Sequence, residues 1–106
     1  MRINGIYMDI LKIKLLSNDY LSIDKAFIRG SYANGNYNYK SDLDLLIISD
    51  DFIGIDMMKR KQLVKNILEP ILCMKIDSIC LSNYEYGLIV MNKKKDIRYD
   101  EMVEVI

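Results

Sequence analysis

Histidine and tryptophan are absent from this chain of 106 residues, and only two cysteines, Cys73 and Cys80, are present. Without histidine, neither a Ser-His-Asp nor a Cys-His catalytic arrangement can form. Two cysteines are too few for a disulfide framework, and no histidine is available to complete a zinc site with them, so we expect both to be core thiols. Any catalysis must therefore depend on carboxylates, hydroxyls, lysines or bound metal ions.

The chain also lacks an excess of charge of either sign, because 15 basic residues balance 15 acidic ones. A protein with zero net charge has no overall field that attracts nucleic acid or an anionic membrane. The basic runs at residues 59–61 and 93–95 are short and typical of solvated surfaces. Nucleic acid and membranes are therefore not expected among the partners, and any partner must be recognised locally.

Long apolar runs are missing as well, since none approaches the roughly 18 residues of a membrane span. The apolar beginning of the chain contains Asp9, Lys12 and Lys14 and lacks a small-residue cleavage site, so it does not resemble a signal peptide. A chain of this length has room for one modest core. The sequence predicts a cytoplasmic protein with a single domain over residues 1–106.

Hydrophobic periodicity and turn signals predict a small mixed β-sheet flanked by helices, in the α/β (α+β) class. Residues 5–16 fit either a helix or a strand, and their length without a turn signal favours a helix. Asp56 is expected to cap a helix that ends about Glu69, before the only proline, Pro70. Its predicted apolar stripe is Met57, Val64, Ile67, Leu68 and Ile71. The other expected elements are a strand at 25–30, a loop at 31–41, a strand at 43–49, a turn at 50–54, a strand at 75–82, a helix capped by Ser82 or Asn83, and a short strand at 102–106.

The pair Asp42 and Asp44 lies at the entry of the firmest predicted strand, "LDLLIIS". Residues two apart in a strand point to the same face, so the two carboxylates are expected side by side. Like charges this close favour a cation between them, and hard oxygen ligands suit Mg²⁺. The alternative is that Asp42 caps a loop and Asp44 points into solvent from an edge strand.

Gly30 and Ser31 follow the strand at 25–30. A glycine at such a turn lets the backbone approach a phosphate closely, and the free N–H groups and the serine hydroxyl can bind its oxygens. A phosphate-binding turn together with paired acids predicts a site for a metal and a nucleotide. Tyr32, Tyr37 and Tyr39 could stack on a base or pack locally, and both readings stay open.

The stretch "GSYANGNYNYKSDLDLLIIS", residues 30–49, resembles the minimal nucleotidyltransferase (MNT) motif of the DNA polymerase beta-type nucleotidyltransferase superfamily, in which G-S-x-A-R-G is followed by S-D-I-D-L. The resemblance covers roughly residues 25–82. One departure is Asn34, which stands where the family has arginine and so lacks a fixed positive charge. The positions in register with the motif are Gly30, Ser31, Ala33, Gly35, Ser41, Asp42, Asp44 and Leu45.

The family resemblance also implies a third carboxylate on a later strand, and Asp77 matches that position. It implies that Asp42, Asp44 and Asp77 are catalytic and bind two Mg²⁺ ions together with ATP, with Asp77 helping to activate the attacking hydroxyl. The alternative for Asp77 is a polar residue on an edge strand. The nucleotide-binding residues implied by the resemblance are Gly30, Ser31, Asn34 and Ser41.

The resemblance implies transfer of AMP from ATP to a hydroxyl acceptor. Small proteins of the MNT type commonly pair, as antitoxins, with a helical HEPN-type toxin, and some modify a tyrosine of that partner. One alternative is a catalytically weak nucleotide-binding module that neutralises a partner by occlusion, which Asn34 keeps open. Another is a small-molecule nucleotidyltransferase subunit that completes its acceptor site as a homo-oligomer.

Overall fold

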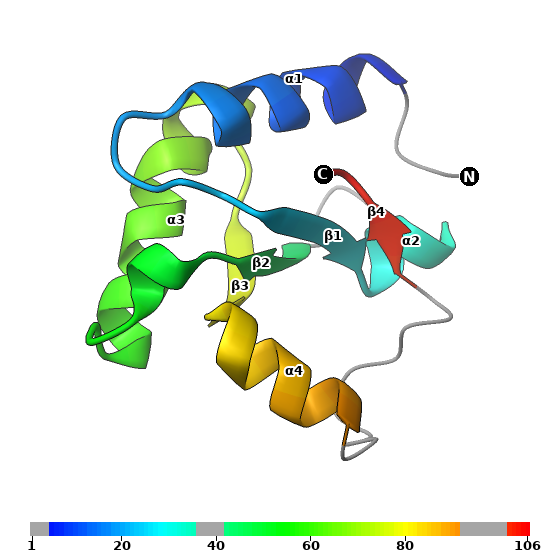
Figure 1. The fold of residues 1–106 in the computed structure, drawn as a ribbon. Helices are drawn as coiled ribbons and strands as arrows, with labels where there is room; N and C mark the ends of the chain where they lie inside the picture. The colour runs from blue at the N-terminus through cyan, green and yellow to red at the C-terminus, as the bar shows by residue number, and fades with distance from the viewer. Residues whose placement is uncertain (1–4, 36–41, 92–101) are drawn as a thin grey trace.

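The computed structural model describes residues 5–35, 42–91 and 102–106, and Figure 1 shows their arrangement. The elements in chain order are α1 (Gly5–Ser17), β1 (Lys25–Arg29), α2 (Ser31–Asn34), β2 (Leu43–Ile48), the 3-10 helix η1 (Asp50–Phe52), α3 (Met57–Leu72), β3 (Ile76–Leu81), α4 (Asn83–Met91) and β4 (Val103–Glu104). The predicted helices and strands occur in the predicted order, and two short helices, α2 and η1, lie where a loop and a turn were expected.

The strands form one mixed sheet in the order β3-β2-β1-β4. Strand β2 runs parallel to β3, and β1 is antiparallel to both β2 and β4. Parallel neighbours need a long crossover connection, which α3 provides between β2 and β3. The mixed sheet flanked by helices is therefore as the sequence predicts.

Strand β2 is apolar on both faces because both faces of the sheet are covered. Leu43, Leu45 and Ile47 belong to the main core, which α1 and α3 complete, whereas Leu46 and Ile48 belong to a smaller cluster beneath α4. Figure 1 shows α1 and α3 on one side of the sheet and α4 on the other. A continuous hydrophobic run is what a strand buried on both faces requires.

The two long connections after β2 begin with the expected caps. The Asp56 carboxylate accepts a hydrogen bond from the Lys59 N–H at 3.0 Å and begins α3, as predicted. At α4, the Ser82 hydroxyl accepts from the Glu85 N–H at 3.2 Å, and the Glu85 carboxylate accepts from the Ser82 N–H at 2.8 Å. This reciprocal pair is a capping box, so Ser82 rather than Asn83 is the cap.

Helix α3 passes through the position at which the sequence predicts its end. It continues beyond Glu69 and Pro70 to Leu72. Proline removes one backbone hydrogen bond, but the loss falls in the last turn, where Leu68 and Leu72 remain buried in the core. The helix ends at Cys73, which has a left-handed backbone (φ 53°) and donates its N–H to the Glu69 carbonyl at 3.0 Å.

This longer helix corrects two expectations. Cys73 is exposed at the helix end and is not a core thiol, whereas Cys80 is buried as predicted. Met57 and Ile71, assigned to the apolar stripe from the sequence, are exposed, and Leu72 is buried in the core. Burial here follows the face that α3 presents to the core, which periodicity alone does not specify.

Part of the predicted loop at 31–41 is helical, because α2 occupies Ser31–Asn34. The Ala33 N–H donates to the Gly30 carbonyl at 3.1 Å, and the side chains of Tyr32 and Ala33 are buried in the main core. Local packing is therefore the confirmed reading for Tyr32. The remaining tyrosines of that loop, Tyr37 and Tyr39, lie outside the described residues. In the part of the chain that is described, no helix is both long and apolar enough to cross a membrane.

Candidate functional site

Three charged side chains lie in one line across the sheet. Arg29 at the end of β1 pairs with Asp44 of β2, and Asp44 pairs with Asp77 of β3. Residues paired in this way on adjacent strands present their side chains on the same face. The face is that of Leu46 and Ile48, with the charged line at the N-terminal end of β2 and the apolar cluster under α4 beyond it.

Asp44 lies on a central strand, because β2 is flanked by β1 and β3. Its side chain is half-buried. This position excludes the alternative in which Asp44 points into solvent from an edge strand. Asp42, directly before β2, is also half-buried and lies near enough to act on Asp44 electrostatically.

The electrostatic environment raises the pKa of Asp44 above its ordinary value. Burial is the largest cause, and the charges of Asp77 and Asp42 raise the pKa further, whereas the nearby Arg29 lowers it. The structure thus brings the three predicted carboxylates into electrostatic contact around Asp44. Their predicted role as catalytic and metal-binding residues remains a prediction.

Asp77 lies on β3, which is an edge strand of the described sheet beside β2, and its side chain is 58% exposed. Its Oδ1 lies 3.9 Å from the Nζ of Lys61 on α3. A half-exposed pair at this distance adds little to stability. The contact nevertheless places a second cation beside the acids, on the side opposite to Arg29.

Gly30 is in close contact with the Asp44 carboxylate. Its backbone has a φ of +69°, and a Cβ at this position would lie 3.3 Å from Asp44 Cγ and overlap Oδ2. Only glycine accepts both conditions without strain. Of the other predicted nucleotide-binding residues, Ser31 and Asn34 lie in α2 with side chains outside the described part of the structure, and Ser41 lies outside the described residues.

The carboxylates suit a divalent cation by their chemistry, because hard oxygen donors are the ligands that Mg²⁺ prefers. Two of them, Asp44 and Asp77, come from adjacent strands in register. Among the described residues, however, no group of three His, Cys, Asp or Glu side chains is arranged to hold a metal ion. The described donors for a metal are therefore the pair Asp44 and Asp77, with Asp42 near enough to act on Asp44 electrostatically.

Sequence reasoning missed Arg29 and Lys61 as members of this site. The signal for Arg29 was the alternation within the strand 25–29, which places Lys25, Phe27 and Arg29 on one face. That face could be matched to Asp44 only once the register of the two strands was known. For Lys61 no signal was available, since its contact depends on how α3 packs beside β3.

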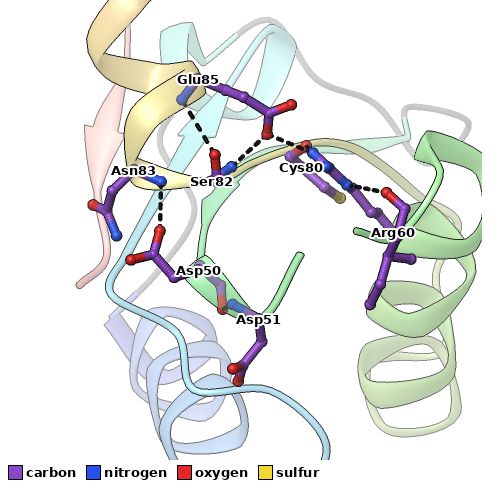
Figure 2. Close-up of polar contacts among 9 residues, drawn as sticks. Asp50, Asp51, Arg60, Cys80, Ser82, Asn83 and Glu85 are labelled. Carbon is purple, nitrogen blue, oxygen red and sulfur yellow. Dashed lines mark hydrogen bonds and ion pairs between the residues drawn. The ribbon is translucent and has the colours of Figure 1, made fainter. Parts of the chain in front are cut away.

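A partly buried ion pair fixes α4 on the same face of the sheet. The Arg60 guanidinium lies 2.6 Å from the Glu85 carboxylate, and it also donates to the Cys80 carbonyl at 3.1 Å (Figure 2). Arg60 is 7% exposed and also lies over the Phe52 ring. The pair joins α3 to the end of β3 and the start of α4, so its role is structural.

The segment after β2 adds two further ties. The Asp50 carboxylate accepts a hydrogen bond from the Asn83 N–H at 3.0 Å, which Figure 2 shows at the start of α4. The Asp51 carboxylate accepts from the Ser22 N–H at 2.7 Å, before β1. These acids are occupied with loop and helix ends, which distinguishes them from Asp44.

The chain matches the family model described as "Polymerase beta, Nucleotidyltransferase" over residues 11–100. The chain belongs to this nucleotidyltransferase family. The match includes both predicted acidic strands, and it confirms the family indicated by residues 30–49.

The crystal structure of a candidate nucleotidyltransferase from Sulfolobus solfataricus is similar to this nucleotidyltransferase domain. The TM-score is 0.52 at 23% sequence identity, and the similarity covers 78% of this chain and 69% of that chain. At this identity the similarity supports the fold, which is that of polymerase beta-type nucleotidyltransferases. No curated protein matches the chain.

Proposed function

We propose that this nucleotidyltransferase domain transfers a nucleoside monophosphate, AMP from ATP, to a hydroxyl acceptor in a Mg²⁺-dependent reaction. The observation that carries the proposal is the pairing of Asp44 with Asp77 across parallel strands, beside Gly30 and with Asp42 in electrostatic reach. The acceptor we favour is a tyrosine of a HEPN-type helical partner, in an antitoxin role. That choice rests on the family resemblance of residues 30–49.

In the proposed reaction the acceptor oxygen forms a bond to the α-phosphorus of ATP, and the bond to the pyrophosphate oxygen breaks. Asp77 accepts the proton of the acceptor hydroxyl, and pyrophosphate leaves. Asp44 and Asp77 would hold Mg²⁺, with Asp42 as a further carboxylate beside them, and the bound ion would supply positive charge to the attacking and leaving oxygens. Gly30 contributes the close backbone approach that leaves room for the Asp44 carboxylate.

The test is transfer of label from ATP labelled at the α-phosphate to the acceptor protein, followed on a denaturing gel and by mass spectrometry of the modified residue. We expect Asp44→Asn and Asp77→Asn each to lower the rate at least about 100-fold, since proton transfer and charge stabilisation each contribute that much. Asp19→Asn, an exposed acid on the loop after α1, is the matched control and should keep full activity. Undiminished transfer by Asp44→Asn would contradict the mechanism.

A catalytically weak module that neutralises its partner by binding is the second candidate. The observation that favours it is the absence of a three-carboxylate cluster among the described residues, with Asp77 facing Lys61. In that case the protein binds MgATP and its partner, but no label is transferred. A small-molecule nucleotidyltransferase subunit that works as a homo-oligomer is the remaining alternative, to be distinguished by measuring the mass of the assembly in solution.

A further inference from the structure

Arg29 is a cation at the acidic end of the sheet for which the described residues provide neither an ion pair nor a hydrogen bond to its guanidinium. Its side chain is half-buried at the end of β1, in register with Asp44. Within the described residues, no ion pair or hydrogen bond is formed by this guanidinium. Lys61, the other cation at the site, is already paired with Asp77. The guanidinium of Arg29 thus lies near Asp44 but keeps its hydrogen-bond donors unused among the described residues.

The other charges on this face of the sheet indicate which ligand Arg29 can bind. Asp42, Asp44 and Asp77 are all negative, and a nucleotide triphosphate adds several more negative charges, so like charges would repel a nucleotide here. A rigid strand fixes Arg29 beside these acids and directly before Gly30, at which the backbone turns. The planar guanidinium matches phosphate oxygens in a bidentate geometry.

We propose that Arg29 is a phosphate-binding residue of this site, whose guanidinium contacts the triphosphate of the bound nucleotide. The inference rests on the nucleotidyltransferase function proposed above and adds a residue to it. Arg29 thereby supplies, from the strand before Gly30, a fixed positive charge that Asn34 cannot supply from α2.

The competing explanation is that Arg29 serves only as the counter-ion of Asp44. One observation opposes it, because no ion pair joins the two side chains in the described structure. The two roles also differ in their consequences. Loss of a counter-ion would affect all ligands of the acidic site alike, whereas loss of a phosphate contact affects ligands according to their phosphate groups.

The experiment compares the binding of inorganic tripolyphosphate, ATP, ADP and AMP in the presence of Mg²⁺, measured by isothermal titration calorimetry. The proteins are the wild type, Arg29→Gln, Arg29→Lys and the matched control Lys25→Gln. Lys25 lies on the same face of the same strand, four residues away, and is exposed. Thermal unfolding of each variant verifies that it is folded.

We expect Arg29→Gln to weaken tripolyphosphate and ATP binding by roughly 10- to 100-fold, as the loss of a charged hydrogen bond predicts, with a smaller loss for AMP. Arg29→Lys keeps the charge but not the planar guanidinium, so it should lose less affinity than Arg29→Gln. If Arg29→Gln does not fold, Arg29→Lys takes its place in the comparison. Lys25→Gln should bind as the wild type does.

Equal binding of tripolyphosphate by Arg29→Gln and the wild type would overturn the assignment of Arg29 and leave the proposed function standing. An equal loss for ATP, ADP and AMP would also overturn it, in favour of the counter-ion role. If the wild type itself binds neither tripolyphosphate nor ATP, the proposed function fails together with this inference, and the two failures are thus distinguishable.

Discussion

Gly30 has no room for a side chain, because the Asp44 carboxylate occupies the position next to it. Its left-handed backbone and its contact with Asp44 act together, since a methyl group here would displace the carboxylate. We expect Gly30→Ala to lower the free energy of unfolding by about 1–3 kcal/mol, the usual cost of a strained residue, and to abolish nucleotidyl transfer. Urea unfolding and the labelled-ATP assay measure the two effects.

Gly54→Ala is the matched control for this prediction. Gly54 also has a positive φ, +82°, but no atom lies within 4 Å of the position that its Cβ would occupy. The control therefore carries the backbone strain without the collision, and it should lose stability while keeping its full rate of transfer. Equal activity of the two variants would show that the contact between Gly30 and Asp44 does not matter for function.

At the scale of elements, α4 depends on the carboxylate of Glu85. Burial raises the pKa of this group, but hydrogen bonds from Arg60 and Ser82 lower it by more, so the pKa in the folded protein lies below its ordinary value of about 4.5. The charged form is therefore favoured by folding. Its contribution is complete above about pH 4.5 and is lost as the pH falls through the lower pKa of the folded state.

Because folding lowers the pKa of Glu85, its replacement by glutamine should change how stability depends on pH. The variant should lose less stability than the wild type between about pH 5 and pH 3, because it has no carboxylate to protonate. Since the Glu85 side chain is 38% exposed, solvent screens the pair, and we expect a difference of only about 0.5–1 kcal/mol. Urea unfolding at several pH values measures it, with exposed Glu104→Gln as the control. Parallel pH profiles for Glu85→Gln and the wild type would contradict this account.

At the scale of the whole molecule, the carboxylates of Asp42, Asp44 and Asp77 repel one another, and a bound cation would offset this repulsion. A ligand that binds only the folded state stabilises it, by about 1.4 kcal/mol at ten times its Kd. For a domain of this size that corresponds to a rise in Tm of roughly 5–10 °C. We therefore expect Mg²⁺ with ATP to raise the Tm of the wild type.

The control for this prediction is Asp44→Asn, whose Tm should not respond to Mg²⁺ with ATP. Without Mg²⁺, the same variant should be at least as stable as the wild type, because removal of one carboxylate relieves repulsion by Asp42 and Asp77. Equal thermal shifts in the two proteins would place the metal elsewhere. Differential scanning fluorimetry over a Mg²⁺ series is sufficient for the comparison.

Local signals predicted most of the fold. The apolar run of β2, the Asp56 cap and the Ser82 cap were all readable, because each depends on residues close together in sequence. Two expectations were wrong in part, namely the end of α3 at Glu69 and the loop over residues 31–41. Pro70 is compatible with the last turn of α3 because buried neighbours outweigh one lost hydrogen bond, and the helical turn at α2 depends on the burial of Tyr32.

By itself, the sequence determined the family and the order of the main helices and strands, and it predicted that Asp42 and Asp44 lie together, because short-range spacing specifies these features. Only the tertiary structure decided which residues surround Asp44. Strand register, which depends on packing between segments far apart in the chain, brought Asp77 to one side of Asp44 and Arg29 to the other. The acid pair follows from a period of two residues, but its cations follow from the alignment of three strands.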